Sequence, residues 1–136
     1  MATVNDKGSI GVAMTVADLL RQGYYVFLPF DGSSPVDLIV ANREMLTKRL
    51  QVKYRVVENR KLRIPLSSVV NGKRVPIKFD KIDEWAVYCP NNDQMYYISK
   101  SYKVVGTSWI VIDPDDNRGS ADVFWSVNCQ GDSSAC

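Results

Sequence analysis

Asp37 and the triplet Gln51-Val52-Lys53 are the residues of this chain whose types and spacing could do chemistry. Asp37 interrupts a nearly apolar run over residues 36–41, and a buried carboxylate is costly unless it is paired or bound to a metal. An acid on one strand and a polar-X-lysine triplet on the next can hold a divalent cation beside a phosphodiester and stabilise the charge that develops. This pattern favours nuclease chemistry.

Strand alternation explains how these groups could meet. Side chains two residues apart in a strand project to the same face. Over residues 49–55 the odd positions are polar and the even ones apolar or aromatic, so Gln51 and Lys53 share a face. A turn at 42–43 would let this strand pair with the preceding one as a hairpin, and the hairpin would bring Asp37 next to Gln51.

Each candidate also has a structural alternative. Asp37 could cap a turn, Lys53 could face solvent, and Gln51 alone carries little information. The large aromatic residues fall in strand-like apolar patterns, which favours a place in the core or in a subunit interface over base stacking. These residues are Trp85, Tyr96, Tyr97, Trp109 and Trp125.

Length and composition bound the class of protein. A chain of 136 residues with 46% hydrophobic content suits one domain with one core. No apolar run approaches the roughly eighteen residues that a membrane span requires, and the start lacks the apolar stretch of a signal peptide, so we expect an intracellular protein. Three cysteines without metal-ligand spacing argue against a disulfide framework, and the absence of histidine excludes Ser-His-Asp hydrolysis and histidine-based metal nucleases.

Charge is unevenly distributed along the chain. The net charge is +2, but residues 43–81 hold twelve Lys and Arg against three acids, a local balance of +9. Such a segment is the footprint expected for contact with a phosphate backbone, although a solvated basic surface would have the same composition. The candidate DNA contacts are Arg49, Arg55, Arg60, Lys61, Arg63, Lys73, Arg74 and Lys78.

Periodicity predicts one helix followed by strands, in a single mixed α/β or α+β domain. Helical spacing of apolar residues predicts a helix over 10–22, stopped by Gly23. Asn71-Gly72 is a turn signal inside the stretch 67–81, so we expect a two-stranded flap with Lys73 and Arg74 near its tip, suited to a groove of DNA. Further strands are expected over 24–29, 36–41, 48–56, 60–65, 84–88, 95–98 and 109–112. The strand over 60–65 is expected to extend the sheet or its hairpin.

The domain is expected to have its core at about 7–112. An acidic tail begins at about residue 113, and its last residues, from Asn128 on, are expected to lack order.

An ordered series of segments carries a family resemblance. The segments are Lys7-Gly8-Ser9-Ile10-Gly11, Gly23-Tyr24-Tyr25-Val26-Phe27-Leu28-Pro29, the Asp37 strand, Gln51-Val52-Lys53-Tyr54, Ala86-Val87-Tyr88-Cys89-Pro90 and Tyr96-Tyr97-Ile98. The series, over about residues 7 to 103, resembles the PD-(D/E)XK endonucleases, and most closely the small homing endonucleases of bacterial group I introns and their free-standing phage relatives.

The resemblance implies a restriction-endonuclease-like fold and a divalent metal, Mg²⁺ or in its place Mn²⁺. Asp37 would bind the ion together with the backbone carbonyl of Val52, and Asp6, Ser9 or Gln51 could supply a further ligand. Relatives usually carry an additional acid in the first helix. Ser9 and Val12 stand at the matching places in this chain, and Asp6 lies just upstream.

The same resemblance implies roles for the triplet and for the whole protein. Lys53 would steady the attacking water or the charge on the phosphate, and Gln51 at the head of the triplet fits the homing branch. We therefore expect a site-specific endonuclease for double-stranded DNA, acting as a homodimer or homotetramer in the cytoplasm of a bacterium or phage-infected host. The alternatives are a DNA-binding protein that has lost strong catalysis, and a Holliday-junction resolvase.

Overall fold

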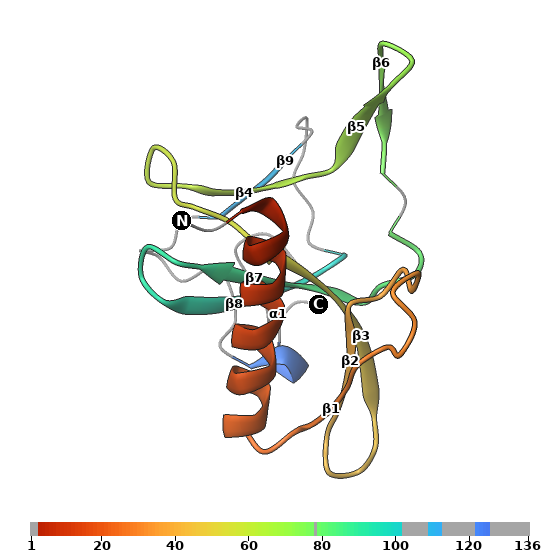
Figure 1. The fold of residues 1–136 in the computed structure, drawn as a ribbon, viewed down its shortest axis with the longest axis vertical. Coiled ribbons are helices and arrows are strands. Elements are labelled where there is room, and N and C mark those ends of the chain that lie inside the picture. The colour runs from red at the N-terminus through yellow and green to blue at the C-terminus, as the bar shows by residue number, and fades with distance from the viewer. Residues whose placement is uncertain (1–2, 78, 102–108, 113–121, 126–136) are drawn as a thin grey trace.

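The fold is mixed α+β, as the sequence predicts, with one N-terminal helix against a central sheet (Figure 1). The structure is a computed structural model that describes residues 3–77, 79–101, 109–112 and 122–125. No helix in these ranges is long and apolar enough to cross a lipid bilayer. The elements are α1 (Val4–Arg21), β1 (Tyr25–Phe27), β2 (Leu38–Ala41), β3 (Thr47–Tyr54), β4 (Leu62–Pro65), β5 (Ser67–Val70), β6 (Lys73–Pro76), β7 (Glu84–Cys89), β8 (Gln94–Ser99), β9 (Trp109–Ile112) and the short 3₁₀ helix η1 (Val123–Trp125).

Helix α1 begins six residues before the predicted start. Thr3 is its N-cap: the Thr3 hydroxyl accepts the N–H of Asp6 at 3.1 Å, and the Thr3 N–H donates to the Asp6 carboxylate at 2.9 Å. This capping box satisfies the first amide groups of the helix. A start at Ile10 was wrong because the first turns are exposed and carry no apolar stripe. The stop at Gly23 is confirmed, with a positive φ of 88° that glycine adopts without strain.

The central sheet has the strand order β1-β2-β3-β7-β8. Strands β1, β2 and β3 are antiparallel neighbours, whereas β3 and β7 run parallel. Leu38 pairs with Leu50, so the same register sets Asp37 opposite Gln51. The predicted hairpin between these strands is therefore confirmed.

Apolar side chains fill both faces of the sheet. On the α1 side they are Leu19, Leu38, Val40, Leu50, Ala86, Tyr97 and Val123. On the opposite side they are Leu62, Ile64, Ile82, Trp85, Val87, Cys89, Tyr96 and Ile98. The core positions expected for Trp85, Tyr96 and Tyr97 are confirmed, while the side chains of Trp109 and Trp125 lie outside the described part of the structure.

Two small sheets complete the fold. Strand β4 was expected to extend the main sheet or its hairpin, but it pairs antiparallel with β9, Leu62 opposite Ile112. That expectation was wrong because the partner strand is some fifty residues away in sequence and leaves no local signal. The flap is confirmed: β5 and β6 form a hairpin through Asn71 and Gly72, both at positive φ, and it projects from the body (Figure 1).

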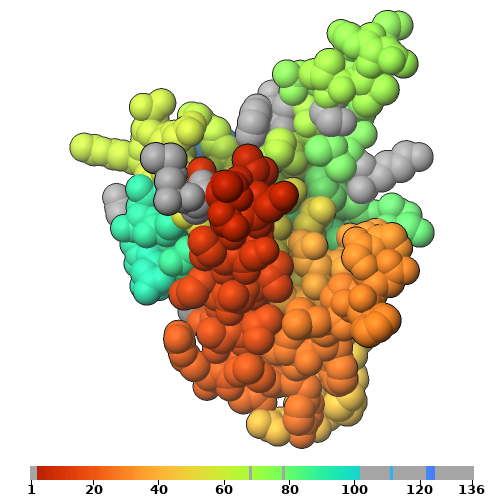
Figure 2. All heavy atoms as spheres, viewed as in Figure 1, coloured from red at the N-terminus to blue at the C-terminus, as the bar shows by residue number. Residues whose placement is uncertain are grey.

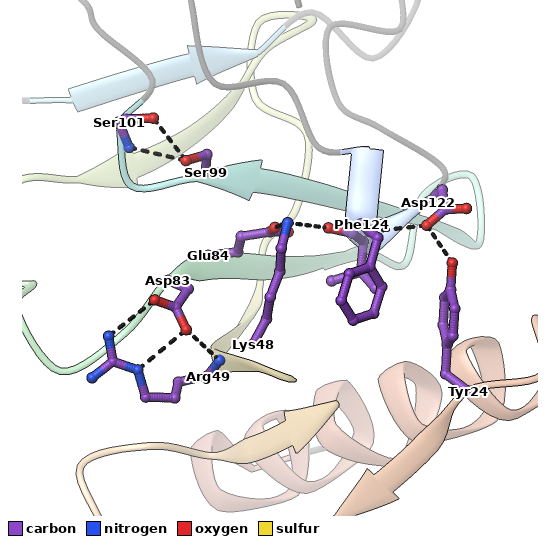
Figure 3. Close-up of polar contacts among 10 residues, drawn as sticks. Tyr24, Lys48, Arg49, Asp83, Glu84, Ser99, Ser101, Asp122 and Phe124 are labelled. Carbon is purple, nitrogen blue, oxygen red and sulfur yellow. Dashed lines mark hydrogen bonds and ion pairs between the residues drawn. The ribbon is translucent and has the colours of Figure 1, made fainter. Parts of the chain in front are cut away.

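A buried ion pair between β3 and β7 also holds η1 against the sheet (Figure 3). Glu84 is 1% exposed and pairs with Lys48, whose ammonium also donates to the carbonyl of Val123 at 3.0 Å. The hydroxyl of Tyr24 donates to Asp122 at 2.7 Å. Burial and the Asp122 carboxylate raise the pKa of Tyr24 to about 12. Apart from 122–125, the expected acidic tail and its end beyond Asn128 lie outside the described residues.

Candidate active site

Asp37 is held in place at the point where β2 begins. Its N–H donates to the carbonyl of Leu50 at 3.0 Å, and one carboxylate oxygen accepts the N–H of Val52 at 2.7 Å. Both contacts are to the backbone of β3, so the carboxyl group is fixed relative to that strand. The second carboxylate oxygen has no hydrogen-bond partner among the described residues, and it is the oxygen with which Asp37 could bind a ligand.

Strand β3 separates its side chains as the sequence predicts. Leu50 and Val52 belong to the core under α1, and alternation therefore sets Gln51 and Lys53 on the other face. Gln51 is the cross-strand neighbour of Asp37. Its amide oxygen is buried and has no hydrogen-bond partner in the described part of the chain, which is unusual for a buried polar atom.

Lys53 is half-buried beside these groups. Burial lowers the pKa of its ammonium, and the positive charge of Arg55 lowers it further, while the carboxylate of Asp37 opposes both effects. Asp37 and Lys53 are therefore close enough to interact electrostatically. Asp37 stands opposite Gln51 in the register of β2 and β3, and Lys53 follows two residues further along β3, so the three residues lie together at this end of the strand pair.

A cleft of about 1040 Å³ opens beside Asp37. It lies between the N-terminal half of α1 and the segment that leads into β2, with Val52 of β3 in its wall (Figure 2). Its lining residues are Val4, Asn5, Gly8, Ser9, Val12, Ala13, Val16, Leu28, Gly32, Asp37 and Val52. Gln51 and Lys53 approach Asp37 from the other face of β3 and are not part of this lining.

The helix wall of the cleft carries no acid. Ser9 and Val12 line it, whereas the carboxylate of Asp6 caps the helix and is not part of the lining. Hydrogen bonds from Thr3 lower the pKa of the exposed Asp6. Across the described residues, no cluster of three or more acids and cysteines could hold a metal ion.

Oxygen atoms without a described protein partner are nonetheless available at Asp37 and at its cross-strand neighbour Gln51. A carboxylate oxygen with no protein partner and a buried, unsatisfied amide oxygen at the paired position are ligands suited to a hard divalent cation. The backbone carbonyl of Val52 and the hydroxyl of Ser9 are the neighbouring oxygens. Such a set fits Mg²⁺, which needs few protein ligands because it retains several waters.

The predicted DNA contacts fall into different environments. Arg49 already has a partner: its guanidinium donates to both carboxylate oxygens of Asp83, at 2.9 Å and 3.2 Å (Figure 3). Arg55 and Arg63 are half-buried, Arg60 is exposed, and Lys61 is partly exposed at the same turn. Lys73 and Arg74 are exposed on the flap, and Lys78 lies outside the described residues.

Gly11 is a residue of the site that sequence reasoning missed. A Cβ at Gly11 would lie 3.1 Å from the Cγ1 atom of Val52, so the glycine lets α1 approach β3 closely. The sequence feature that could have identified Gly11 is its position one helical turn after Lys7, in the segment that carries the family resemblance.

Comparisons with known proteins identify the family and the fold. The family model described as PD-(D/E)XK endonuclease matches residues 2–125. Among solved structures, a bacterial homing endonuclease, I-Ssp6803I, is similar with a TM-score of 0.67 and 17% identity, covering 82% of this chain and 78% of that chain. At this identity the likeness shows the fold. A search of the curated proteins finds no match.

Proposed function

The chain belongs to the PD-(D/E)XK endonuclease family, and we propose that it is a metal-dependent, site-specific endonuclease of the homing type that cuts double-stranded DNA. The observation that carries this proposal is the convergence at one end of β3. The Asp37 carboxylate, the unsatisfied amide oxygen of Gln51 and the half-buried Lys53 meet there.

Each residue of the site has a task in the proposed reaction. Asp37 and the carbonyl of Val52 would hold Mg²⁺ or Mn²⁺, with the amide oxygen of Gln51 or the hydroxyl of Ser9 as the further ligand; the ion, when bound, would polarise the phosphoryl oxygen and lower the pKa of its water. Lys53 presents a positive charge in a partly desolvated place, where it stabilises the negative charge that develops on the phosphate.

Contact with DNA would extend from this site to the flap. Lys73 and Arg74 are exposed on β6, and Arg74 is oriented by a hydrogen bond from its guanidinium to Ser67 at 3.0 Å. A two-stranded ribbon of this kind fits a DNA groove. Replacing both residues by alanine should weaken binding and make its salt dependence shallower. An unchanged salt slope in a filter-binding titration would place the contact elsewhere.

Cutting both strands requires more than one copy. One chain offers a single Asp37–Lys53 site in its described part, so a closed homodimer or homotetramer would supply the second site.

The test is cleavage of a supercoiled plasmid library with a randomised insert, in Mg²⁺ and in Mn²⁺. A site-specific enzyme yields linear products whose ends map to one recurring sequence. Lys53→Ala should lower the rate on the order of a hundredfold or more while sparing affinity, and Lys100→Ala, an exposed lysine outside the site, should change neither. Equal loss of rate and affinity in Lys53→Ala would contradict the role of Lys53.

One observation favours a second candidate, a DNA-binding protein of this fold with weakened catalysis. The helix wall of the cleft presents Ser9 and Val12, so Asp37 is the sole carboxylate in the cleft lining. Tight binding of a duplex with no cutting in either metal would select this candidate. Cutting confined to a synthetic four-way junction would instead identify a resolvase.

A further inference from the structure

The polar face of strand β3 ends in Arg55, whose side chain has no hydrogen-bond partner among the described residues. Arg55 follows β3 directly, and its N–H continues the pairing with β7 by donating to the carbonyl of Tyr88 at 3.0 Å. Its side chain is half-buried, and its Nε atom is buried with no hydrogen-bond partner in the part of the chain that the structure describes. A second unsatisfied polar atom thus lies in the row that holds Gln51.

Arg49 lies on the same face of the same strand and provides a comparison for Arg55, because it forms an ion pair with Asp83. Asp83 accepts two hydrogen bonds from its guanidinium and raises the pKa of Arg49. The pKa of Arg55 is lowered by burial, and no acidic side chain of the described residues offsets that effect. Arg55 also repels Lys53.

A half-buried guanidinium without a counter-ion destabilises the fold unless a bound ligand accepts its hydrogen bonds and balances its charge. The ligands that match its planar set of donors are carboxylates and phosphates. Two residues along a strand separate Lys53 and Arg55 by about 7 Å. This spacing is comparable to the separation of successive phosphates along one DNA strand, so a backbone lying along β3 can meet both cations.

We infer that Arg55 is a positioning residue that binds the DNA phosphate next to the scissile one and so sets the register of the substrate strand on β3. This inference rests on the proposed function. The bound phosphate would satisfy the free Nε atom of Arg55 and screen its repulsion of Lys53. Positioning of this kind lowers the barrier by holding the scissile bond in line with the attacking water.

The test compares Arg55→Gln with Arg21→Gln, which removes the same charge from an exposed position at the far end of α1. Binding of a short fluorescein-labelled duplex of mixed sequence is titrated in Ca²⁺ at several NaCl concentrations. Arg55→Gln should make the slope of log K against log salt shallower by about 0.9 and weaken binding on the order of tenfold, and Arg21→Gln should change neither. Arg55→Lys should retain the slope of log K against log salt, because the positive charge is kept. It should nevertheless nick a plasmid more slowly than wild type in Mn²⁺, because a lysine cannot form the bidentate hydrogen bonds of a guanidinium.

Unfolding in urea without DNA separates this role from a structural one. Arg55→Gln should unfold at the same or a higher urea concentration than wild type, because it removes an uncompensated charge. A lower midpoint together with an unchanged salt slope would make Arg55 a structural residue and overturn the inference. If the wild-type protein binds the duplex but does not cut DNA, the proposed catalytic function is wrong. The salt dependence of binding by Arg55→Gln would still decide whether Arg55 binds a phosphate.

Discussion

Replacing Gly11 by alanine would test how closely α1 must approach β3. The added Cβ would lie 3.1 Å from Cγ1 of Val52 and 3.7 Å from Cβ of Tyr54, and the first distance is shorter than an ordinary contact. Alanine favours the helix by about 1 kcal/mol, whereas overpacking a well-filled interface costs about 1–3 kcal/mol. Gly11→Ala should therefore lower the free energy of unfolding by about 0–2 kcal/mol.

Gly8→Ala is the matched control in the same helix. A Cβ at Gly8 would meet nothing within 4 Å, so the propensity gain should appear undiminished, at about 1 kcal/mol. Urea unfolding followed by tryptophan fluorescence should separate the two variants by about 1–3 kcal/mol. Gly11→Ala should also nick plasmid more slowly than wild type, because Val52 must shift and its backbone is hydrogen-bonded to Asp37. Equal stabilisation by both substitutions would refute the close approach as the reason for glycine at this position.

Three other substitutions probe the ion pairs and the cleft. Lys48→Met leaves Glu84 charged and buried, and it should lower the free energy of unfolding by about 3–5 kcal/mol in urea melts, a loss that Lys48→Met with Glu84→Leu should largely reverse. Hydrogen bonds from Arg49 lower the pKa of Asp83, so this carboxylate adds stability above its unfolded pKa of about 3.9 and loses it as the pH falls through the folded value. The stability difference between wild type and Asp83→Asn, on the order of 1 kcal/mol at neutral pH for this partly exposed pair, should shrink as the pH falls below the unfolded pKa of about 3.9, and a constant difference would contradict the linkage. Val12→Glu would add a carboxylate to the cleft, so Mg²⁺ should raise its urea midpoint more than that of wild type, and an identical shift in both proteins would show that position 12 does not reach the ion.

Features of the fold that depend on neighbouring residues were predictable from the sequence, and most of those that depend on distant residues were not. The strand around Gln51, the turn before it and the resulting neighbour, Asp37, were predictable because alternation and turn chemistry act within a few residues. The start of α1 was not, although Thr3 and Asp6 form a recognisable capping box, because the helical stripe of apolar residues begins only at Ile10.

The sequence by itself determined which groups share a face of β3 and which acid stands beside them, since a strand's period and a hairpin's register are local properties of the chain. Only the tertiary structure decided what each group meets. It paired Arg49 with Asp83 and placed no described acid beside Arg55, and it set Asp6 at the helix end while Ser9 lines the cleft. These outcomes depend on how segments far apart in sequence pack together, and packing follows from the summed burial of the whole core.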